Sequence, residues 1–373
     1  MKAHEWLALA VQHKASDIFV GAGRYISFKI NGVVATAGET PITMAEAKEF
    51  IDELYALAER SNEQFKNSGD DDFSVTISKL ARFRVNTYNQ RSTPAAVIRV
   101  VLFELPNPQN LEIPDEVMRI AGVKNGLVLV TGVTGSGKST TLACIIDAIN
   151  KSRTGHIITL EDPIEYLHRD KMCLISQREI PTDTKSYITA LRACLRQSPD
   201  IVLLGEMRDE ETIKTAMTAA ETGHLVISTL HTMGAAKTID RIIDAFPPEQ
   251  QPQMRTQLAM ILRTVVSQQL VKRKDGTLIP AFEIMHVNKD IQKLIIESKT
   301  FQIDTQIDIG KSMGMIGMDA YLTSLVERSE IAMETAVTNA TKPDEMKTIF
   351  ESRFFDEFRD ESVVRVSKKA DWF

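Results

Sequence analysis

The segment GVTGSGKS at residues 132–139 constrains the fold of this chain more than any other. It fits the pattern GxxxxGK[ST], in which the backbone N–H groups of a glycine-rich turn converge on phosphate oxygens. The apolar run GLVLV precedes it, and a helical pattern follows with one apolar face: Leu142, Ile145, Ile146 and Ile149. A glycine-rich turn that arose by chance is not expected to have both a strand before it and a helix after it. The sequence therefore predicts a strand–loop–helix unit whose loop binds phosphate at the positive end of the helix.

Two residues of this phosphate loop have well-defined expected roles. Lys138 should reach the β and γ phosphates of a nucleotide, and Ser139 should be a ligand of Mg²⁺. The other loop residues expected to contact nucleotide are Thr134, Gly135, Ser136, Gly137 and Thr140. ATP and Mg²⁺ are thus the predicted cofactors.

The apolar runs between about residues 115 and 290 predict the fold class. They are continuous rather than alternating, and they lie at 127–130, 157–160, 201–204 and 225–227. Strands that are buried on both faces have this pattern, so we expect an α/β domain with a parallel sheet flanked by helices. Ligands of such sheets bind at the carboxyl ends of the strands.

Acidic residues follow two of these strands. Glu206 comes after the run at 201–204, which is the pattern of a Walker B strand whose carboxylate handles Mg²⁺ through water. Glu161, Asp162 and Glu165 follow the run at 157–160. Carboxylates beside a phosphate site repel the nucleotide, so we expect these to have a function there, such as orienting the attacking water or shaping the Mg²⁺ shell. The alternatives are a capping acid at 206 and a solvated acidic turn at 161–165.

Two histidines lie near the fourth strand. His231, in the segment STLHT at its carboxyl end, could donate to the γ-phosphate or to the attacking water. His224, in Thr222-Gly223-His224, follows the end of a predicted helix. Taken alone, either histidine is more often a packing or capping residue.

Residues 1–104 predict a small α+β domain. A helix is expected around 6–12, a strand at 26–30 with an Asn31-Gly32 turn, and a helix that begins at a Thr43/Glu46 capping box. Residues 61–72 suggest a loop or a frayed helix end, and strand-like runs follow near 73–77, 82–88 and 95–102. We expect a linker at 105–114, an ATPase domain at 115–290, and a C-terminal helical region with a charged tail at 291–373.

Charge and composition exclude several classes of protein. Lys plus Arg number 44 against 50 Asp plus Glu, so the net charge of −6 disfavours a dedicated nucleic-acid binder. No run reaches the roughly 18 apolar residues of a membrane span. The three cysteines form no CxxC pair, which favours a reducing cytosol over a disulfide or zinc framework.

Several motifs in this order resemble the secretion ATPase superfamily, and more narrowly the PilT retraction ATPases of type IV pili. They are GVTGSGKSTT, TLEDPIEY, GEMRD, AAETGHLV, STLHT and KTIDRIIDAFP, with ASDIFV and RFRVNTYNQ in the first domain. The resemblance implies a PAS-like domain followed by a RecA-like P-loop ATPase domain, assembled as a homohexameric ring. It places that ring in the cytoplasm, peripheral to the inner membrane, against a pilus platform protein.

The resemblance also implies roles for individual residues. Glu165 matches the catalytic glutamate of the family's acidic motif, to which Glu161 also belongs, and Glu206 matches the Walker B acid. His224 and His231 match its histidine motif. Arg84 and Arg99 match first-domain arginines that face the nucleotide; on residue pattern alone they would be solvated arginines of a sheet face.

One departure leaves alternatives open. The family has an AIRNLIRE-like motif tied to retraction, and the aligned stretch here, KDIQKLIIE at 289–297, lacks both arginines. A PilU-like accessory ATPase is therefore an alternative to the main retraction motor. An extension ATPase of the PilB or GspE type is less favoured, since those chains usually add an N-terminal domain and a four-cysteine zinc motif. A nucleic-acid translocase is disfavoured by charge, and a module that binds without hydrolysis by the acids at 161, 165 and 206.

Overall fold

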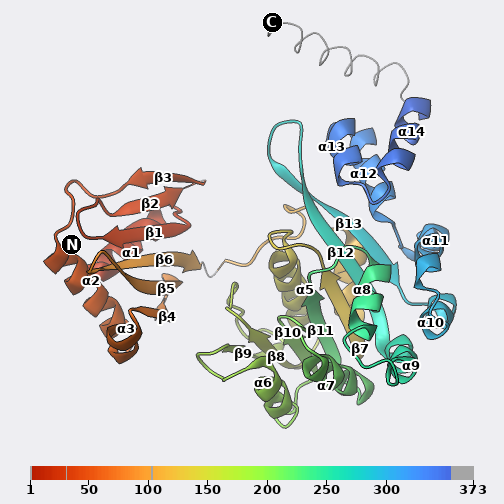
Figure 1. Cartoon of the computed structure of the whole chain (residues 1–373), viewed down its shortest axis with the longest axis horizontal. Coiled ribbons are helices and arrows are strands. Elements are labelled where there is room, and N and C mark those ends of the chain that lie inside the picture. The colour runs from red at the N-terminus through yellow and green to blue at the C-terminus, as the bar shows by residue number, and fades with distance from the viewer. Residues whose placement is uncertain (1, 31, 102–103, 354–373) are drawn as a thin grey trace, which may run out of the picture. The chain divides into compact units, whose positions relative to one another are not determined.

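The computed structural model describes residues 2–30, 32–101 and 104–353 of the chain (Figure 1). Its contacts define two compact units. The first is Met1–Leu105 with Glu165–His168, and the second is Pro106–Ile164 with Arg169–Phe373. Residues 106–114 thus belong to the second unit, while the linker at 105–114 stays a prediction, as do the boundaries at 114 and 290.

The first unit is a six-stranded antiparallel sheet with helices, in the order β3-β2-β1-β6-β5-β4. Its strands are β1 (Asp17–Gly21), β2 (Ser27–Ile30), β3 (Val33–Thr36), β4 (Asp70–Ile77), β5 (Ala81–Gln90) and β6 (Thr93–Val101). Its helices are α1 (Ala3–Gln12), α2 (Met44–Leu57) and α3 (Glu63–Ser68). The core lies between the sheet and the apolar faces of α1 and α2.

Local patterns predicted most of this unit. The capping box is confirmed: Thr43 Oγ1 accepts from the Glu46 N–H at 3.2 Å, and Glu46 Oε2 accepts from the Thr43 N–H at 2.7 Å. The hairpin is confirmed by the pairing of Ile30 with Val33, although Asn31 itself lies outside the described residues.

The interpretation of residues 61–72 as a loop or frayed helix end was wrong in part. The segment contains α3, which ends at Gly69 in a left-handed conformation, and the first residues of β4. Asp71, which suggests a solvated turn in sequence, is buried because the Tyr55 hydroxyl and the Arg60 guanidinium donate to its carboxylate at 3.1 and 2.9 Å. A paired inward-facing acid cannot be told from a solvated one by residue type.

The second unit is built on a seven-stranded sheet in the order β13-β12-β7-β11-β10-β8-β9. Its strands are β7 (Gly126–Thr131), β8 (Gly155–Glu161), β9 (Cys173–Glu179), β10 (Ile201–Leu204), β11 (Leu225–Leu230), β12 (Leu262–Lys272) and β13 (Leu278–His286). All neighbours pair in parallel except β12 and β13.

Helices cover both faces of this sheet (Figure 1). They are α4 (Asp115–Met118), η1 (Arg119–Gly122), α5 (Lys138–Ser152), α6 (Tyr187–Cys194), α7 (Glu210–Glu221), α8 (Ala235–Ile243), α9 (Gln251–Ile261), α10 (Lys289–Ile296), η2 (Thr300–Gln302), α11 (Ile303–Ile309), η3 (Gly310–Met313), α12 (Met318–Glu327), α13 (Met333–Asn339) and α14 (Pro343–Arg353).

The two faces of β7 pack against different helices. Leu127 and Leu129 face α6, α7, α8 and α9, whereas Val128 and Val130 face α5 and the segment before β7.

The α/β class, the four apolar strands and the helix after the phosphate loop are confirmed. The predicted C-terminal helical region contains α10 to α14, and the end of its predicted charged tail, residues 354–373, lies outside the described residues. Sequence reasoning did not single out β9, β12 or β13, and β13 makes one edge of the sheet antiparallel. Polar residues inside these strands, such as Gln177 and Gln268, obscure the continuous apolar pattern.

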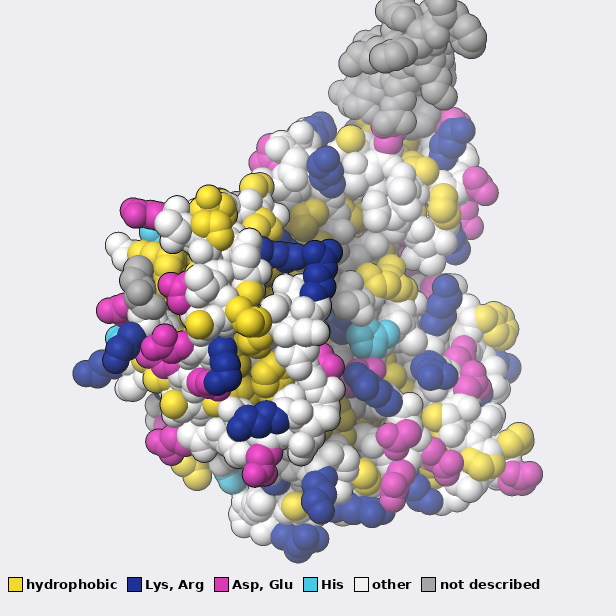
Figure 2. All heavy atoms as spheres, turned by 60° about the vertical axis from the view of Figure 1, so that its left-hand side comes forward, with side chains coloured by type: hydrophobic (Ala, Val, Ile, Leu, Met, Phe, Trp, Pro, Cys, Tyr) yellow, Lys and Arg dark blue, Asp and Glu magenta, His cyan; other side chains and the backbone are white. Residues whose placement is uncertain are grey.

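The described surface mixes both signs of charge. On the face drawn in Figure 2, Lys and Arg side chains are scattered among Asp and Glu rather than gathered in one patch. Among the described residues, no helix combines the length and the apolar character that crossing a membrane requires.

Candidate nucleotide-binding site

The phosphate loop joins β7 to α5 at the carboxyl edge of the second sheet, and two of its glycines are required by geometry. Gly132 has a φ of 142°, and a Cβ there would overlap the main-chain oxygen of Gln268. Gly137 has a φ of 89° and immediately precedes α5. Both positions combine a left-handed backbone with a close neighbour, so any larger residue would distort the loop.

The loop holds a positive charge and donor groups in a compact turn. Lys138 Nζ donates to the main-chain oxygens of Gly132 at 2.8 Å and Val133 at 2.9 Å. The hydroxyl of Ser136 is buried and has no hydrogen-bond partner among the described residues. An orphaned hydroxyl, an ammonium group and a helix N-terminus in one turn fit a phosphate chain.

Glu206 and His231 meet beside this loop. Glu206 Oε1 lies 3.3 Å from His231 Nε2, and the other ring nitrogen of His231 lies 3.5 Å from Thr134 Oγ1. Arg208 Nε donates to Glu206 Oε2 at 2.8 Å, and this hydrogen bond raises the pKa of Arg208. The structure therefore brings the predicted Walker B acid and one predicted histidine to the phosphate loop.

The end of β8 adds a further carboxylate. Glu161 Oε1 accepts from Gln177 Nε2 at 3.2 Å, and the preceding Leu160 oxygen accepts from the Gly205 N–H at 2.8 Å. β8 and β10 are neighbours, so Glu161 and Glu206 follow adjacent strands at the same edge. The roles of both acids at a nucleotide stay predictions.

Sequence reasoning missed Tyr187, the first residue of α6. Its hydroxyl lies 2.8 Å from where a Cβ of residue 205 would be, directly before Glu206. Burial raises the pKa of Tyr187, and the carboxylates of Asp162 and Glu206 add to the effect. The hydroxyl therefore stays protonated and adds a neutral donor to the acidic edge. A single aromatic residue at a helix start looks like a core residue, so no sequence pattern identified it.

His224 lies at the opposite edge of the sheet from the phosphate loop, and its expected role at a nucleotide stays a prediction. It was expected among the nucleotide-binding residues, but it precedes β11, at the amino edge of the sheet, whereas His231 follows the same strand. Six residues of strand separate the two edges by about 20 Å. His224 Nδ1 lies 2.9 Å from the Ala219 oxygen, near the end of α7, so it caps a helix and does not reach the phosphate loop of its own chain.

The predicted arginines lie in the first unit. Arg84 of β5 pairs directly with Arg99 of β6, which confirms that the two share one face of the sheet. Arg99 Nε donates to the buried carboxylate of Asp17 at 3.2 Å. Glu165 is exposed and belongs to the segment grouped with the first unit. The roles of these three residues at a nucleotide stay predictions.

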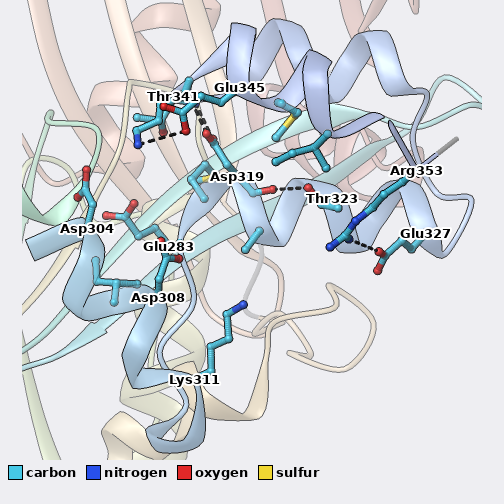
Figure 3. A pocket seen from close by; sticks show the side chains of 17 residues that line it. Glu283, Asp304, Asp308, Lys311, Asp319, Thr323, Glu327, Thr341, Glu345 and Arg353 are labelled. Carbon is cyan, nitrogen blue, oxygen red and sulfur yellow. Dashed lines mark hydrogen bonds and ion pairs between the residues drawn. The ribbon is translucent and has the colours of Figure 1, made fainter. Parts of the chain in front are cut away.

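Two cavities of the second unit differ in character. One of about 260 Å³ adjoins the phosphate loop and is mostly apolar, with Gly137, Thr140, Gln268, Leu270, Leu278 and Pro280 in its wall. The other, of about 420 Å³, lies among the C-terminal helices (Figure 3). We call it the C-terminal acidic pocket, after its six carboxylates: Glu283, Asp304, Asp308, Asp319, Glu327 and Glu345.

Comparisons with known proteins agree with this site. The family model described as type II/IV secretion system protein matches residues 2–308. The chain is 41% identical over 344 residues to the type IV pilus retraction ATPase PilT of Pseudomonas aeruginosa, covering 92% of this chain and 99% of that protein. It is 34% identical to the type IV pilus ATPase PilU of the same organism, covering 93% and 91%.

A solved structure supports the same assignment. The crystal structure of the pilus retraction motor PilT with bound ADP superposes with a TM-score of 0.86 at 39% identity, covering 93% of this chain and 99% of that one. With the phosphate loop, Glu206 and His231 at one edge of the sheet, the chain belongs to the type II/IV secretion system protein family and, within it, to the PilT-like ATPases.

Proposed function

We propose that this chain is the ATP-driven motor of type IV pilus retraction and thereby of twitching motility. The observation that carries the proposal is the cluster of Lys138, Glu206 and His231 in a chain that spans 99% of PilT. The phosphate loop supplies positive charge where phosphates bind, and the acidic edge supplies groups that act on water and metal.

The proposed nucleotide site uses the phosphate loop and the cavity beside it. Lys138 would exchange its contacts with Gly132 and Val133 for phosphate oxygens, because those oxygens carry full negative charge. The mostly apolar cavity beside Gly137 and Thr140 is large enough for a nucleobase, and it adjoins the helix N-terminus where the phosphates would lie.

Ser139 and Glu206 are the proposed protein groups that would hold Mg²⁺, which would supply positive charge against the phosphates when bound. A hydroxyl and a carboxylate are the hard oxygen donors that this ion prefers, and Mg²⁺ usually takes its remaining ligands from water and phosphate. The described residues contain no group of three His, Cys, Asp or Glu able to hold a metal on their own. The proposed site accordingly depends on the nucleotide.

Glu165 is proposed to activate water, and Arg84 and Arg99 are proposed to supply positive charge to a nucleotide within a homohexameric ring. Charge that develops on the transferred phosphoryl group needs more than one lysine beside several carboxylates. The test is specific ATPase activity against protein concentration for wild type, Arg84→Ala and Arg99→Ala. We expect activity to rise with assembly and each substitution to lower it at least tenfold. Full activity in a dilute monomer would contradict the ring.

The proposed setting is the cytoplasmic face of the inner membrane, where the ring would act on a pilus platform protein. The alternative is a PilU-like accessory ATPase, and one observation favours it. In α10, where the retraction-linked motif aligns, Gln292 and Ile296 stand in place of its two arginines.

Deletion of the gene distinguishes these functions. Loss of the main retraction motor should give long, non-retracting pili and no twitching, and a Lys138→Ala copy should not restore it. Unchanged pilus retraction would assign the accessory role, and cells without pili would overturn retraction in favour of extension.

A further inference from the structure

Two consecutive buried glutamines of β12 face opposite parts of the second unit. Gln268 and Gln269 are 3% and 7% exposed. Gln268 adjoins the phosphate loop, whereas Gln269 Nε2 donates to the main-chain oxygen of Asn339, at the end of α13, at 3.0 Å. Burying an amide is costly unless it is hydrogen-bonded, so each side chain contributes to a definite contact.

Gln268 adjoins the phosphate loop at two glycines and contacts the first turn of α5 at Thr141. Its Oε1 accepts from the hydroxyl of Thr141, in the first turn of α5, at 2.7 Å. Its Nε2 lies 2.8 Å from where a Cβ of residue 137 would be, and its main-chain oxygen fills the space that a Cβ of residue 132 would need. One residue therefore adjoins both strained glycines and the first turn of the helix that begins directly after Gly137.

The strand that carries Gln268 is itself fixed to the strand before the loop. β12 pairs in parallel with β7, with Ser267 opposite Thr131, and the two hydroxyls lie 2.7 Å apart. Because Oε1 is occupied by Thr141, the NH₂ group of Gln268 is directed to Gly137. The amide thus has one orientation, set by its neighbours.

We infer that Gln268 is a positioning residue that holds the phosphate loop in its phosphate-binding shape before any nucleotide arrives. The inference rests on the proposed nucleotide site and goes beyond it, because Gln268 acts through Gly132, Gly137 and Thr141 rather than on the reacting atoms. Preorganised donors bind phosphate more tightly than a loop that must be ordered on binding.

The experiment compares matched variants of the full-length chain. Gln268→Leu removes the amide beside the loop, and Gln269→Leu removes the neighbouring amide on the same strand, which contacts α13 instead. Thr141→Val removes only the hydroxyl that binds Gln268, and Thr141→Ser keeps it. Binding of ADP and of inorganic tripolyphosphate is measured by calorimetry, together with melting temperature and amide hydrogen exchange in the loop without nucleotide.

We expect Gln268→Leu and Thr141→Val to lower the affinity for ADP and for tripolyphosphate by the same factor, about tenfold or more, because each variant loses one buried hydrogen bond. Loop exchange should speed up without nucleotide, and Thr141→Ser should restore wild-type values. Gln269→Leu should lower the melting temperature and leave affinity unchanged.

Equal affinity losses in the Gln268 and Gln269 variants, or a Thr141→Val protein with unchanged affinity and exchange, would overturn the inference. A wild-type protein that binds neither ligand would instead overturn the proposed nucleotide site. The milder Thr141 variants keep the test decisive if Gln268→Leu fails to fold.

Discussion

The carboxyl edge of the second sheet and the C-terminal acidic pocket are both rich in carboxylates, yet the surroundings of these carboxylates differ. At the edge, Glu206 has Arg208 on one oxygen and His231 near the other. In the pocket, Figure 3 shows Glu283, Asp304 and Asp308 close together. Burial raises the pKa of both Glu283 and Asp304; Asp304 raises the pKa of Glu283 further, and Asp308 raises that of Asp304.

The difference shows that cavity size does not identify the reactive site. The C-terminal acidic pocket has about 420 Å³ against about 260 Å³ beside the phosphate loop, but its carboxylates would repel a triphosphate. The smaller cavity is lined by Gly137 and Thr140 at the N-terminus of α5, and the N-terminus of a helix attracts phosphate. Placement of charge therefore decides between them.

The largest expected effect comes from removing the lysine of the edge. Lys138→Ala should lower ATP turnover by about 10³-fold or more, because no other side chain of the phosphate loop puts a full positive charge on the β and γ phosphates. Asp308→Asn removes one charge from the C-terminal acidic pocket and should leave turnover unchanged. Steady-state phosphate release measures both, with the circular dichroism spectrum as the control for folding. Near wild-type turnover in a folded Lys138→Ala protein would contradict the proposal that the phosphate loop is the nucleotide site.

A second test separates two acids by role. Glu165→Gln should bind MgATP normally and turn over about 10²-fold or more slowly, since it would lose a general base. Glu206→Gln should instead alter the Mg²⁺ concentration needed for half-maximal activity. Titration of activity against Mg²⁺ and binding of MgATP distinguish them. The reverse pair of phenotypes would exchange the two assignments.

The sequence allowed the edge to be predicted and not the pocket, for a physical reason. Gly132, Glu206 and His231 follow the carboxyl ends of strands, and Lys138 starts the helix after the phosphate loop. Topology alone brings the ends of parallel strands together. Tyr187 and Gln268 reach the same edge from a helix start and from the middle of a strand, so no spacing marks them. The C-terminal acidic pocket likewise depends on how α11, α12 and α14 pack, which periodicity does not encode.

A third test compares one arginine–glutamate ion pair in each region. Arg208→Gln should lower turnover by about tenfold, because Glu206 would lose a charge-assisted hydrogen bond beside the phosphates. Arg353→Gln breaks a pair with Glu327 in the C-terminal acidic pocket, at 3.4 Å, whose two side chains are both largely exposed. Such pairs contribute little, so turnover and melting temperature should both stay near wild type. Equal effects of the two substitutions on turnover would contradict the comparison.

The smallest expected effect is a pH-dependent change in stability at Glu283. This carboxyl is buried, which raises its pKa, and Asp304 of α11 and Asp319 of α12 raise it further, while the backbone N–H groups of Ala235 and Met318 oppose the shift. Because the folded pKa lies above the unfolded one, the folded state binds more protons between them. Stability therefore falls as the pH rises through that window, and the ionised group is destabilising above it.

Glu283→Gln removes this titration and keeps an oxygen that accepts from the Ala235 N–H, a bond of 2.6 Å in the wild type. The variant should be more stable than wild type at neutral pH. Its advantage should shrink as the pH falls from the raised folded pKa to the ordinary pKa of a glutamate, and it should be constant below that, because wild-type Glu283 is then protonated in both states. Urea-unfolding midpoints between pH 4 and 8 measure the difference, with the largely exposed Glu327→Gln as the matched control. A stability difference that does not change with pH would show that burial does not shift the pKa of Glu283 between the folded and unfolded states, and the contrast between the two regions would be lost.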